Sequence, residues 1–208
     1  MKSYIIHFIR HGSIDDTLAG KYIGTTDAPL SDRGRMDLRK LDYEYKYPGT
    51  QVVFTSPLKR CTETAKILYP EQNPLVIDNL SECNFGEWEG KTADELKNDP
   101  DFKKWLAGDS SVKPPRGESN ADFTRRLCKM FESIVEGLMK TGTTESVIVT
   151  HGGVIMTLLA VYGLPQAKPF EWTMDNGFGY SLRVTPVLWQ RDKVCEVFQT
   201  IPLPSEND

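Results

Sequence analysis

Cationic and imidazole side chains follow three apolar segments of the chain. Arg10 and His11 end the segment "SYIIHFIRHG", Arg60 comes shortly after "QVVFTS", and His151 directly follows "SVIVT". Guanidinium groups bind phosphate oxygens through paired hydrogen bonds. These residue types together predict a site that binds a phosphoryl group.

The three apolar segments are typical of buried strands. The polar residues that follow each segment should therefore lie at the edge of a sheet where the strand ends. In an open parallel sheet, ligands bind beyond the carboxyl ends of the strands. Side chains that follow different strands are therefore expected to meet in one pocket. A helix is expected to begin at the Gly152-Gly153 pair, and the amides at a helix start also favour an anion.

Strands and helices are expected to alternate along the chain. The expected strands span 3–9, 51–56, 75–77, 146–150, 179–187 and 193–200, and the expected helices span 31–45, 57–68, 121–140 and 153–162. Ser31 is the expected cap of the first helix, and Pro57 is expected in the first turn of the second. The alternation predicts a three-layer α/β/α sandwich with a mostly parallel central sheet.

Length and composition narrow the class of protein. The chain has 208 residues, of which 39% are hydrophobic and 26% charged, as in an ordinary globular protein. One domain, residues 1–208, is expected. The net charge of -4 argues against a general nucleic-acid binder or a protein that binds anionic membranes, because both need a surplus of Lys and Arg.

The cysteines and the apolar segments indicate a compartment. The four cysteines are widely spaced with no CxxC pair, so reduced thiols are expected instead of a zinc cluster or redox motif. No segment approaches the ~18 apolar residues of a membrane span, and the N-terminus lacks the features of a secretory signal. A cytoplasmic location is expected.

Six short motifs resemble those of the histidine phosphatase superfamily, in its phosphoglycerate mutase-like branch. They are "RHG" (10–12), "GTTDAPLSDRG" (24–34), "TSPLKRCTETA" (55–65), "ECNFGEWEG" (82–90), "RGES" (116–119) and "VTHGG" (149–153). Each motif is weak alone, but their shared order and compatible spacing over most of the chain make chance agreement improbable. The resemblance implies a phosphoglycerate mutase-like fold.

The resemblance also implies a two-step reaction. His11 would attack phosphorus through one ring nitrogen while a backbone carbonyl holds the other, and water would then hydrolyse the phosphohistidine. Arg10, Arg60 and His151 would bind the phosphoryl oxygens, and no metal or cofactor is implied. Glu82 matches the general acid of the family, and burial near Phe85 and Trp88 would raise its pKa.

Several residues have a second interpretation. Glu87 and Glu89 are alternative acids, or they lie on a solvated turn. His7 lies inside the first expected strand and is interpreted as a hydrogen-bonded core residue. Trp105, Trp172 and Trp189 are expected to serve packing in the core or a lid. Residues 91–119 form either a loop with one short helix or a cap that determines substrate specificity.

The chain also departs from the family pattern. Ser13 and Thr17 stand where many relatives have glutamate and asparagine, so Thr17 would offer phosphate one hydroxyl in place of an amide. The short length and the "ECNFGEWEG" segment most resemble the alpha-ribazole phosphatases, which favours hydrolysis of a small phosphomonoester such as alpha-ribazole 5'-phosphate.

Other functions and assembly states remain open. A phosphoglycerate mutase-type transferase and a non-catalytic binding protein are the alternatives, and the intact cluster of Arg10, His11, Arg60, Glu82 and His151 argues against the second. The closing apolar strands could pair in a homodimer or simply end the sheet.

Overall fold

A seven-stranded sheet with the strand order β4-β3-β5-β1-β7-β8-β6 organises the chain. The computed structural model describes residues 2–109 and 111–204. The strands of this sheet are β1 (Tyr4–Arg10), β3 (Val52–Thr55), β4 (Leu75–Val76), β5 (Glu145–Thr150), β6 (Gly163–Leu164), β7 (Gly179–Val184) and β8 (Cys195–Ile201), and a separate pair joins β2 (Tyr45–Lys46) to β9 (Leu203–Pro204). β7 runs antiparallel to β1 and β8, and the other pairings in the large sheet are parallel.

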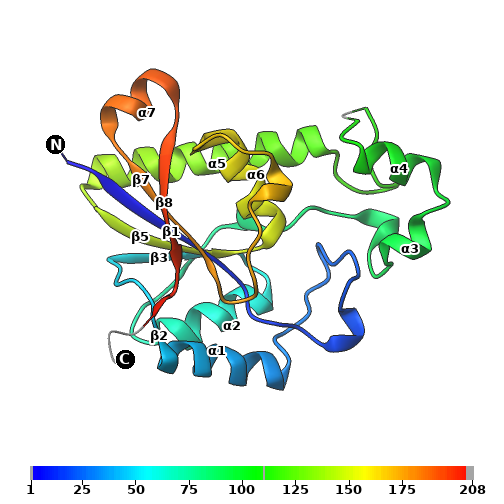
Figure 1. Cartoon of the computed structure of the whole chain (residues 1–208), viewed down its shortest axis with the longest axis horizontal. Helices are drawn as coiled ribbons and strands as arrows, with labels where there is room; N and C mark the ends of the chain where they lie inside the picture. The colour runs from blue at the N-terminus through cyan, green and yellow to red at the C-terminus, as the bar shows by residue number, and fades with distance from the viewer. Residues whose placement is uncertain (1, 110, 205–208) are drawn as a thin grey trace.

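Helices cover both faces of this sheet. The α-helices are α1 (Asp32–Glu44), α2 (Lys59–Leu68), α3 (Ala93–Leu96), α4 (Pro100–Leu106), α5 (Asn120–Thr141), α6 (Gly152–Tyr162) and α7 (Pro186–Asp192), and the short 3-10 helices are η1 (Asp16–Leu18), η2 (Asp78–Leu80), η3 (Gly86–Trp88) and η4 (Pro169–Glu171). The pair α5 and α6 lies on one face and the pair α1 and α2 on the other (Figure 1). The α/β/α arrangement predicted from the sequence is confirmed.

The alternation of side chains along the central strands explains why two apolar layers form. Phe8 and Ile148 point into the core that α5 and α6 cover, whereas their neighbours Ile9 and Val149 point into the core beside α1 and α2. Successive side chains of a strand face opposite sides of a sheet. Strands that are apolar on both sides therefore need helices on both sides, which the alternating sequence supplies.

The pairing of β1 with β5 places the two site histidines side by side. In this parallel pair Arg10 is opposite Thr150, so each strand is followed directly by a histidine, His11 or His151. The ring centroids of these histidines lie 5.2 Å apart. Backbone register alone thus joins two parts of the chain that are 140 residues apart in sequence.

Proline accounts for two differences from the sequence predictions. The strand expected over 179–187 ends at Val184, and the turn expected after it contains helix α7, in which Pro186 is the first residue. Proline suits this first helical position because it lacks the N–H that would be left unpaired. The helix expected from Pro57 begins instead at Lys59, with Leu58 as its cap, so Pro57 lies before its first turn.

Residues 91–119 hold two short helices, α3 and α4, away from the main sheet (Figure 1). Trp88, Leu96 and Phe102 form a small apolar cluster here, with Tyr22 and Trp105 packed against it. This cluster is separate from the two cores of the sheet. The segment thus has its own packing, and its expected role as a cap is taken up below.

The closing strands lie near one edge of the sheet. β7 lies between β1 and β8, and the two-residue strand β6 pairs with β8 at Cys195 and Glu196. No helix within residues 2–109 and 111–204 is long and apolar enough to cross a membrane.

Candidate active site

His11 follows the last residue of β1 and is held as a neutral base. Its ring Nδ1 lies 2.7 Å from the carbonyl oxygen of Gly12, which requires a proton on Nδ1 and leaves Nε2 with a free lone pair. Burial, together with the positive charges of Arg60 and Arg10, lowers the pKa of His11 to about 3. The expected backbone carbonyl is therefore present, and the ring is in the form that can attack phosphorus.

Arg10 presents a buried donor without a partner. One terminal nitrogen, Nη1, donates to the carbonyl oxygen of Met174 at 2.8 Å, but Nε has no hydrogen-bond partner among the residues that the structure describes. A buried N–H without a partner is costly, and such groups usually mark a place where a ligand supplies the acceptor. Arg10 and His11 line the same cavity. Phosphate oxygen is the acceptor that suits a guanidinium donor.

Arg60, in the first turn of α2, is held by the loop that precedes α1. Its terminal nitrogens donate to the carbonyl oxygens of Thr26 and Gly24 at 2.7 and 2.8 Å, and Nε donates to Nδ1 of His151 at 3.2 Å. The side chain is 1% exposed. These bonds fix the guanidinium in place, and its charge acts on both His11 and Glu82.

His151 directly follows β5 and caps α6, and both of its ring nitrogens have protein partners. Nδ1 accepts from Arg60, so Nε2 carries the proton and donates to the hydroxyl of Ser56 at 2.8 Å. Burial holds the pKa of His151 well below its usual value, so the ring is neutral. In this arrangement His151 braces Arg60, and its predicted contact with phosphate remains a prediction.

Glu82 lies at the start of helix α6, across from the arginines. Its two carboxyl oxygens accept from the amides of Cys83 and Gly153, each at 3.0 Å. Burial raises the pKa of Glu82, although these amides and the charges of Arg60 and Arg10 oppose the change. The Gly153 amide is one of the helix-start amides expected to bind phosphate, and here it donates to the Glu82 carboxyl instead.

Position 153 has to be glycine for this contact. A Cβ atom there would lie 2.5 Å from Oε1 of Glu82, well inside van der Waals contact. Any larger residue would push the carboxyl away from the amide that holds it.

The alternative acids occupy other places. Glu87 is exposed and pairs with Arg116, with 3.2 Å between Oε1 and Nε. Glu89 accepts from the amides of Gly24 and Thr25 at 3.0 and 2.7 Å. Neither residue lines the cavity that contains His11 and Glu82. Glu89 instead ties down the loop whose carbonyl oxygens hold Arg60.

The expected environment of Glu82 is found in part. Phe85 lines the cavity beside Glu82. Trp88 does not, because it is buried in the cluster next to α4, where its Nε1 donates to Asp99 at 3.1 Å. The predicted direction of the pKa change is therefore found, with Phe85 but not Trp88 at the site.

Thr17 is not brought together with the other site residues. It lies on the exposed 3-10 turn η1, and its hydroxyl donates to Asp15 at 2.6 Å. Its neighbours Asp16 and Leu18 line the cavity, whereas Thr17 does not. Its role in phosphate binding stays a prediction that the geometry does not support.

The remaining sequence interpretations concern packing. His7 is buried and hydrogen-bonds Ser181 at 2.8 Å through Nδ1, so its interpretation as a core histidine is confirmed. Trp172 and Trp189 belong to the core beside α5 and α6, and Trp105 packs against the cluster at α4.

Three supporting residues were not predicted from the sequence. The side-chain amide of Asn176 donates to the carbonyl oxygen of His11 at 2.7 Å, and Thr64 accepts from the amide of Gly12 at 2.9 Å. The hydroxyl of Ser56 accepts a hydrogen bond from Nε2 of His151. Each is far from its partner in sequence and has no local motif, apart from the position of Ser56 at the end of an expected strand.

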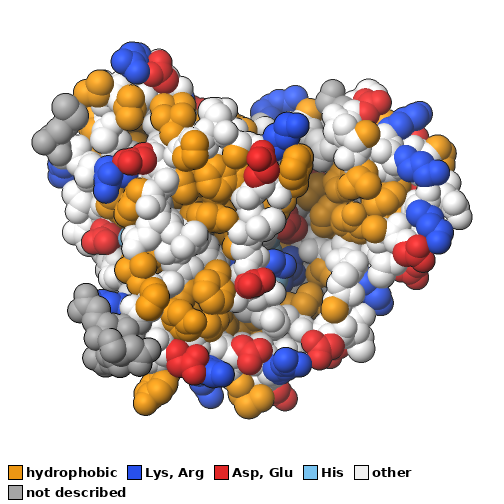
Figure 2. All heavy atoms as spheres, in the orientation of Figure 1, with side chains coloured by type: hydrophobic (Ala, Val, Ile, Leu, Met, Phe, Trp, Pro, Cys, Tyr) orange, Lys and Arg blue, Asp and Glu red, His pale blue; other side chains and the backbone are white. Residues whose placement is uncertain are grey.

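The site opens into a cavity of about 480 Å³ that includes Arg10, His11, Arg60 and Glu82 among its lining residues. Figure 2 shows a hollow between the lobe of α3 and α4 and the main body, with charged side chains visible in its depth. Within the described residues, no group of three or more His, Cys, Asp or Glu side chains is placed to share a metal ion.

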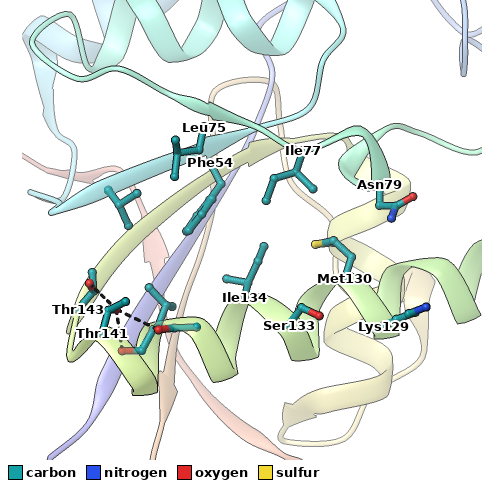
Figure 3. A pocket seen from close by; sticks show the side chains of 13 residues that line it. Phe54, Leu75, Ile77, Asn79, Lys129, Met130, Ser133, Ile134, Thr141 and Thr143 are labelled. Atoms are coloured by element: carbon teal, nitrogen blue, oxygen red, sulfur yellow. Dashed lines mark hydrogen bonds between the residues drawn. The ribbon is translucent and has the colours of Figure 1, made fainter.

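A second cavity, of about 570 Å³, lies between β3, β4 and α5 (Figure 3). Phe54 of β3, Ile134 of α5 and Ile77, which follows β4, point into it, and Lys129 is the charged residue among those that line it. It contains neither a histidine nor a carboxyl group from the described chain. It therefore lacks the imidazole and the carboxyl group that the first cavity brings together.

A family model described as the histidine phosphatase superfamily (branch 1) matches residues 6–195. The chain belongs to this superfamily. This histidine phosphatase is 29% identical over 174 residues to "Phosphoserine phosphatase 1" of Hydrogenobacter thermophilus, with 81% of each chain covered. It is 25% identical over 198 residues to "Adenosylcobalamin/alpha-ribazole phosphatase" of Salmonella typhimurium, which covers 93% of this chain and 92% of the relative.

Solved structures support the fold of this histidine phosphatase. The phosphoglycerate mutase of Bacillus anthracis superimposes with a TM-score of 0.76 at 19% identity, covering 95% of this chain and 92% of the mutase. At this identity the likeness concerns the fold. The predicted phosphoglycerate mutase-like fold and the predicted superfamily are both confirmed.

Proposed function

We propose that the protein hydrolyses phosphomonoesters of a small metabolite through a phosphohistidine on His11. One arrangement carries the proposal: a neutral His11, fixed by the Gly12 carbonyl, shares a cavity with the unpartnered Nε of Arg10 and with Glu82, whose pKa is raised. The site thus combines a nucleophile, a donor for anionic oxygens and an acid.

In the first step, the lone pair on Nε2 of His11 forms a bond to phosphorus, and the bond from phosphorus to the ester oxygen breaks. Glu82 gives its proton to the departing alkoxide. Arg10 and Arg60 stabilise the charge on the phosphoryl oxygens, and each preset donor of this kind can contribute ~3 kcal/mol. His151 acts by holding Arg60.

In the second step, water attacks phosphorus and the bond from phosphorus to Nε2 breaks. Glu82, now a carboxylate, takes a proton from the water, so one group serves as acid and then as base. Free phosphate leaves and the enzyme returns to its starting state. No metal ion or cofactor takes part in this scheme.

The relatives support hydrolysis over transfer to a second position of the same molecule. Both are named phosphatases, and the relative from Salmonella is matched over almost its whole length. We take alpha-ribazole 5'-phosphate as the first substrate to test because of that relative, with phosphoserine as the second. The mutase alternative is not favoured, and the intact site argues against a protein that only binds.

The test is release of inorganic phosphate in EDTA from alpha-ribazole 5'-phosphate, phosphoserine, 3-phosphoglycerate and sugar phosphates. We expect release by the native protein and at least a ~1000-fold loss in His11→Ala. Labelled substrate should leave an acid-labile phosphoryl group on the native protein and none on the variant. Isomer formation without free phosphate would support the mutase, and the absence of both products would support the binding protein.

The remaining expectations extend this proposal. The partner is a small phosphomonoester, and the net charge of -4 disfavours nucleic acid. The four cysteines are free thiols in the structure, as expected for a protein of the cytoplasm. A homodimer stays a prediction that light scattering can test.

A further inference from the structure

A chamber of about 780 Å³ opens beside the phosphate cavity, between α4, the start of α5, α6 and η4. The two share four lining residues, Glu82, Phe85, Gly153 and Met156. The carboxyl group that protonates the leaving alcohol therefore lies at the boundary between them. Whatever is attached to that alcohol must extend from Glu82, and the chamber is the space next to it.

The walls of the chamber are mostly apolar and include four aromatic rings. Phe85, Trp105, Phe123 and Phe170 contribute rings from four separate segments of the chain. Among the described residues that line the chamber, Glu82 and Lys168 are the charged ones. A polyol or a second anionic group would lose its contacts with water here and find few polar partners.

Exposed apolar side chains also gather at this chamber. Leu106, Val161 and Phe170 are 63%, 39% and 65% exposed, and they come from α4, α6 and η4. All three line the chamber. In Figure 2, hydrophobic side chains lie on the lobe of α3 and α4 and on the main body across the hollow. Apolar surface that converges from separate elements typically marks a binding site.

Resting on the proposed function, we infer that the substrate is the phosphomonoester of an alcohol that carries a bulky, flat apolar group, and that the chamber binds this group. Aromatic rings suit such walls because they bury a large area and pack edge-to-face against other rings. Lys168, whose Nζ lies 5.8 Å from the centre of the Phe170 ring, stands at the mouth of the chamber. The 91–119 segment thereby acts as the predicted cap, because α4 supplies one wall.

The test compares three phosphate esters of primary aliphatic alcohols, which keeps the leaving groups chemically alike. These are 2-(1-naphthyl)ethyl phosphate, propyl phosphate and glycerol 1-phosphate. We expect kcat/KM for the naphthyl ester to exceed that for propyl phosphate at least ~10-fold, since an apolar pocket discriminates by this order for a few carbon atoms. Glycerol phosphate should be the poorest of the three.

The double variant Leu106→Ala/Phe170→Ala removes two walls at positions exposed enough to leave the fold intact. We expect the ratio of kcat/KM between the naphthyl and propyl esters to fall at least ~5-fold. The matched control, Leu75→Ala/Phe198→Ala, removes the same residue types at exposed positions outside the chamber and should keep the native ratio.

The outcomes separate the two proposals. Phosphate release from all three esters at similar kcat/KM, or an equal ratio in both double variants, would overturn the inference while leaving hydrolysis established. No release from any ester, including those of the panel above, would overturn the proposed function and the inference with it.

Discussion

At the scale of single residues, burial shifts the pKa values of the two groups proposed to react, His11 and Glu82, in opposite directions. It lowers the pKa of His11 to about 3, which keeps the base unprotonated, and it raises the pKa of Glu82, which favours the protonated acid. Burial disfavours the charged form of either group. The same physical cause thus prepares a nucleophile and a proton donor in one cavity.

Glu82→Gln should slow the first step most for esters whose leaving group must be protonated as it departs. For an alkyl ester we expect a ~100-fold to 10,000-fold loss of kcat. The burst of p-nitrophenolate from p-nitrophenyl phosphate should fall far less, because that anion leaves without protonation. Equal losses for both esters would contradict the role of Glu82 as the acid.

The pH profile tests the same assignment. The acid form of Glu82 is lost as pH rises through its raised pKa, so kcat/KM for an alkyl ester should decline with rising pH. His11 stays neutral down to about pH 3 and should not set a limit near neutrality. Measured between pH 4 and 8 with the native protein and Glu82→Gln, the decline should be missing in the variant.

At the scale of elements, the loop before α1 acts as a holder for Arg60. Its carbonyl oxygens at Gly24 and Thr26 accept from Arg60, and its amides at Gly24 and Thr25 donate to Glu89. Hydrogen bonds to a charged acceptor are stronger than those between neutral groups. Glu89 therefore positions an arginine that it does not touch.

Glu89→Ala should destabilise the protein by about 1–3 kcal/mol, because the amides of Gly24 and Thr25 lose their acceptor. The variant should also raise KM, because the loop would hold the Arg60 side chain less firmly. Glu87→Ala is the matched control. It removes an exposed ion pair with Arg116, and such pairs contribute about 0–1 kcal/mol. Urea unfolding and steady-state kinetics measure both effects, and equal effects of the two variants would contradict the holding role.

At the scale of the whole molecule, one sheet supports two cores. Phe131, on α5, is fully buried on one face, and Leu38, on α1, is 1% exposed on the other. Alternate residues of β1 and β5 belong to each core. Loss of packing on either face should therefore weaken the other face, as in a single domain.

Phe131→Ala and Leu38→Ala should each shift one common unfolding transition. We expect losses of about 3–5 and 2–5 kcal/mol, as for large cavities in a packed core. Far-UV circular dichroism and tryptophan fluorescence should give coincident curves for each variant. Separate transitions, with one variant affecting only one of them, would contradict the single domain predicted from the sequence.

The sequence by itself determined the alternation of elements and the mostly parallel sheet, and it nominated the residues proposed to react. Apolar periodicity can be read from neighbouring residues in the sequence. A residue that directly follows a buried strand must lie at the edge of the sheet where that strand ends. Arg10, His11 and His151 could therefore be named without a structure. Glu82 was named from its motif, and its role as the acid stays a prediction.

Only the tertiary structure decided how these residues are held. The bonds of Ser56 to His151 and of Asn176 to His11 join residues that are 95 and 165 positions apart, and Thr17, named from its motif position, bonds its own turn instead. The choice between Glu82, Glu87 and Glu89 likewise depended on which carboxyl faces the cavity. Such contacts follow from strand register and packing, which bring distant segments together and leave no local pattern in the sequence.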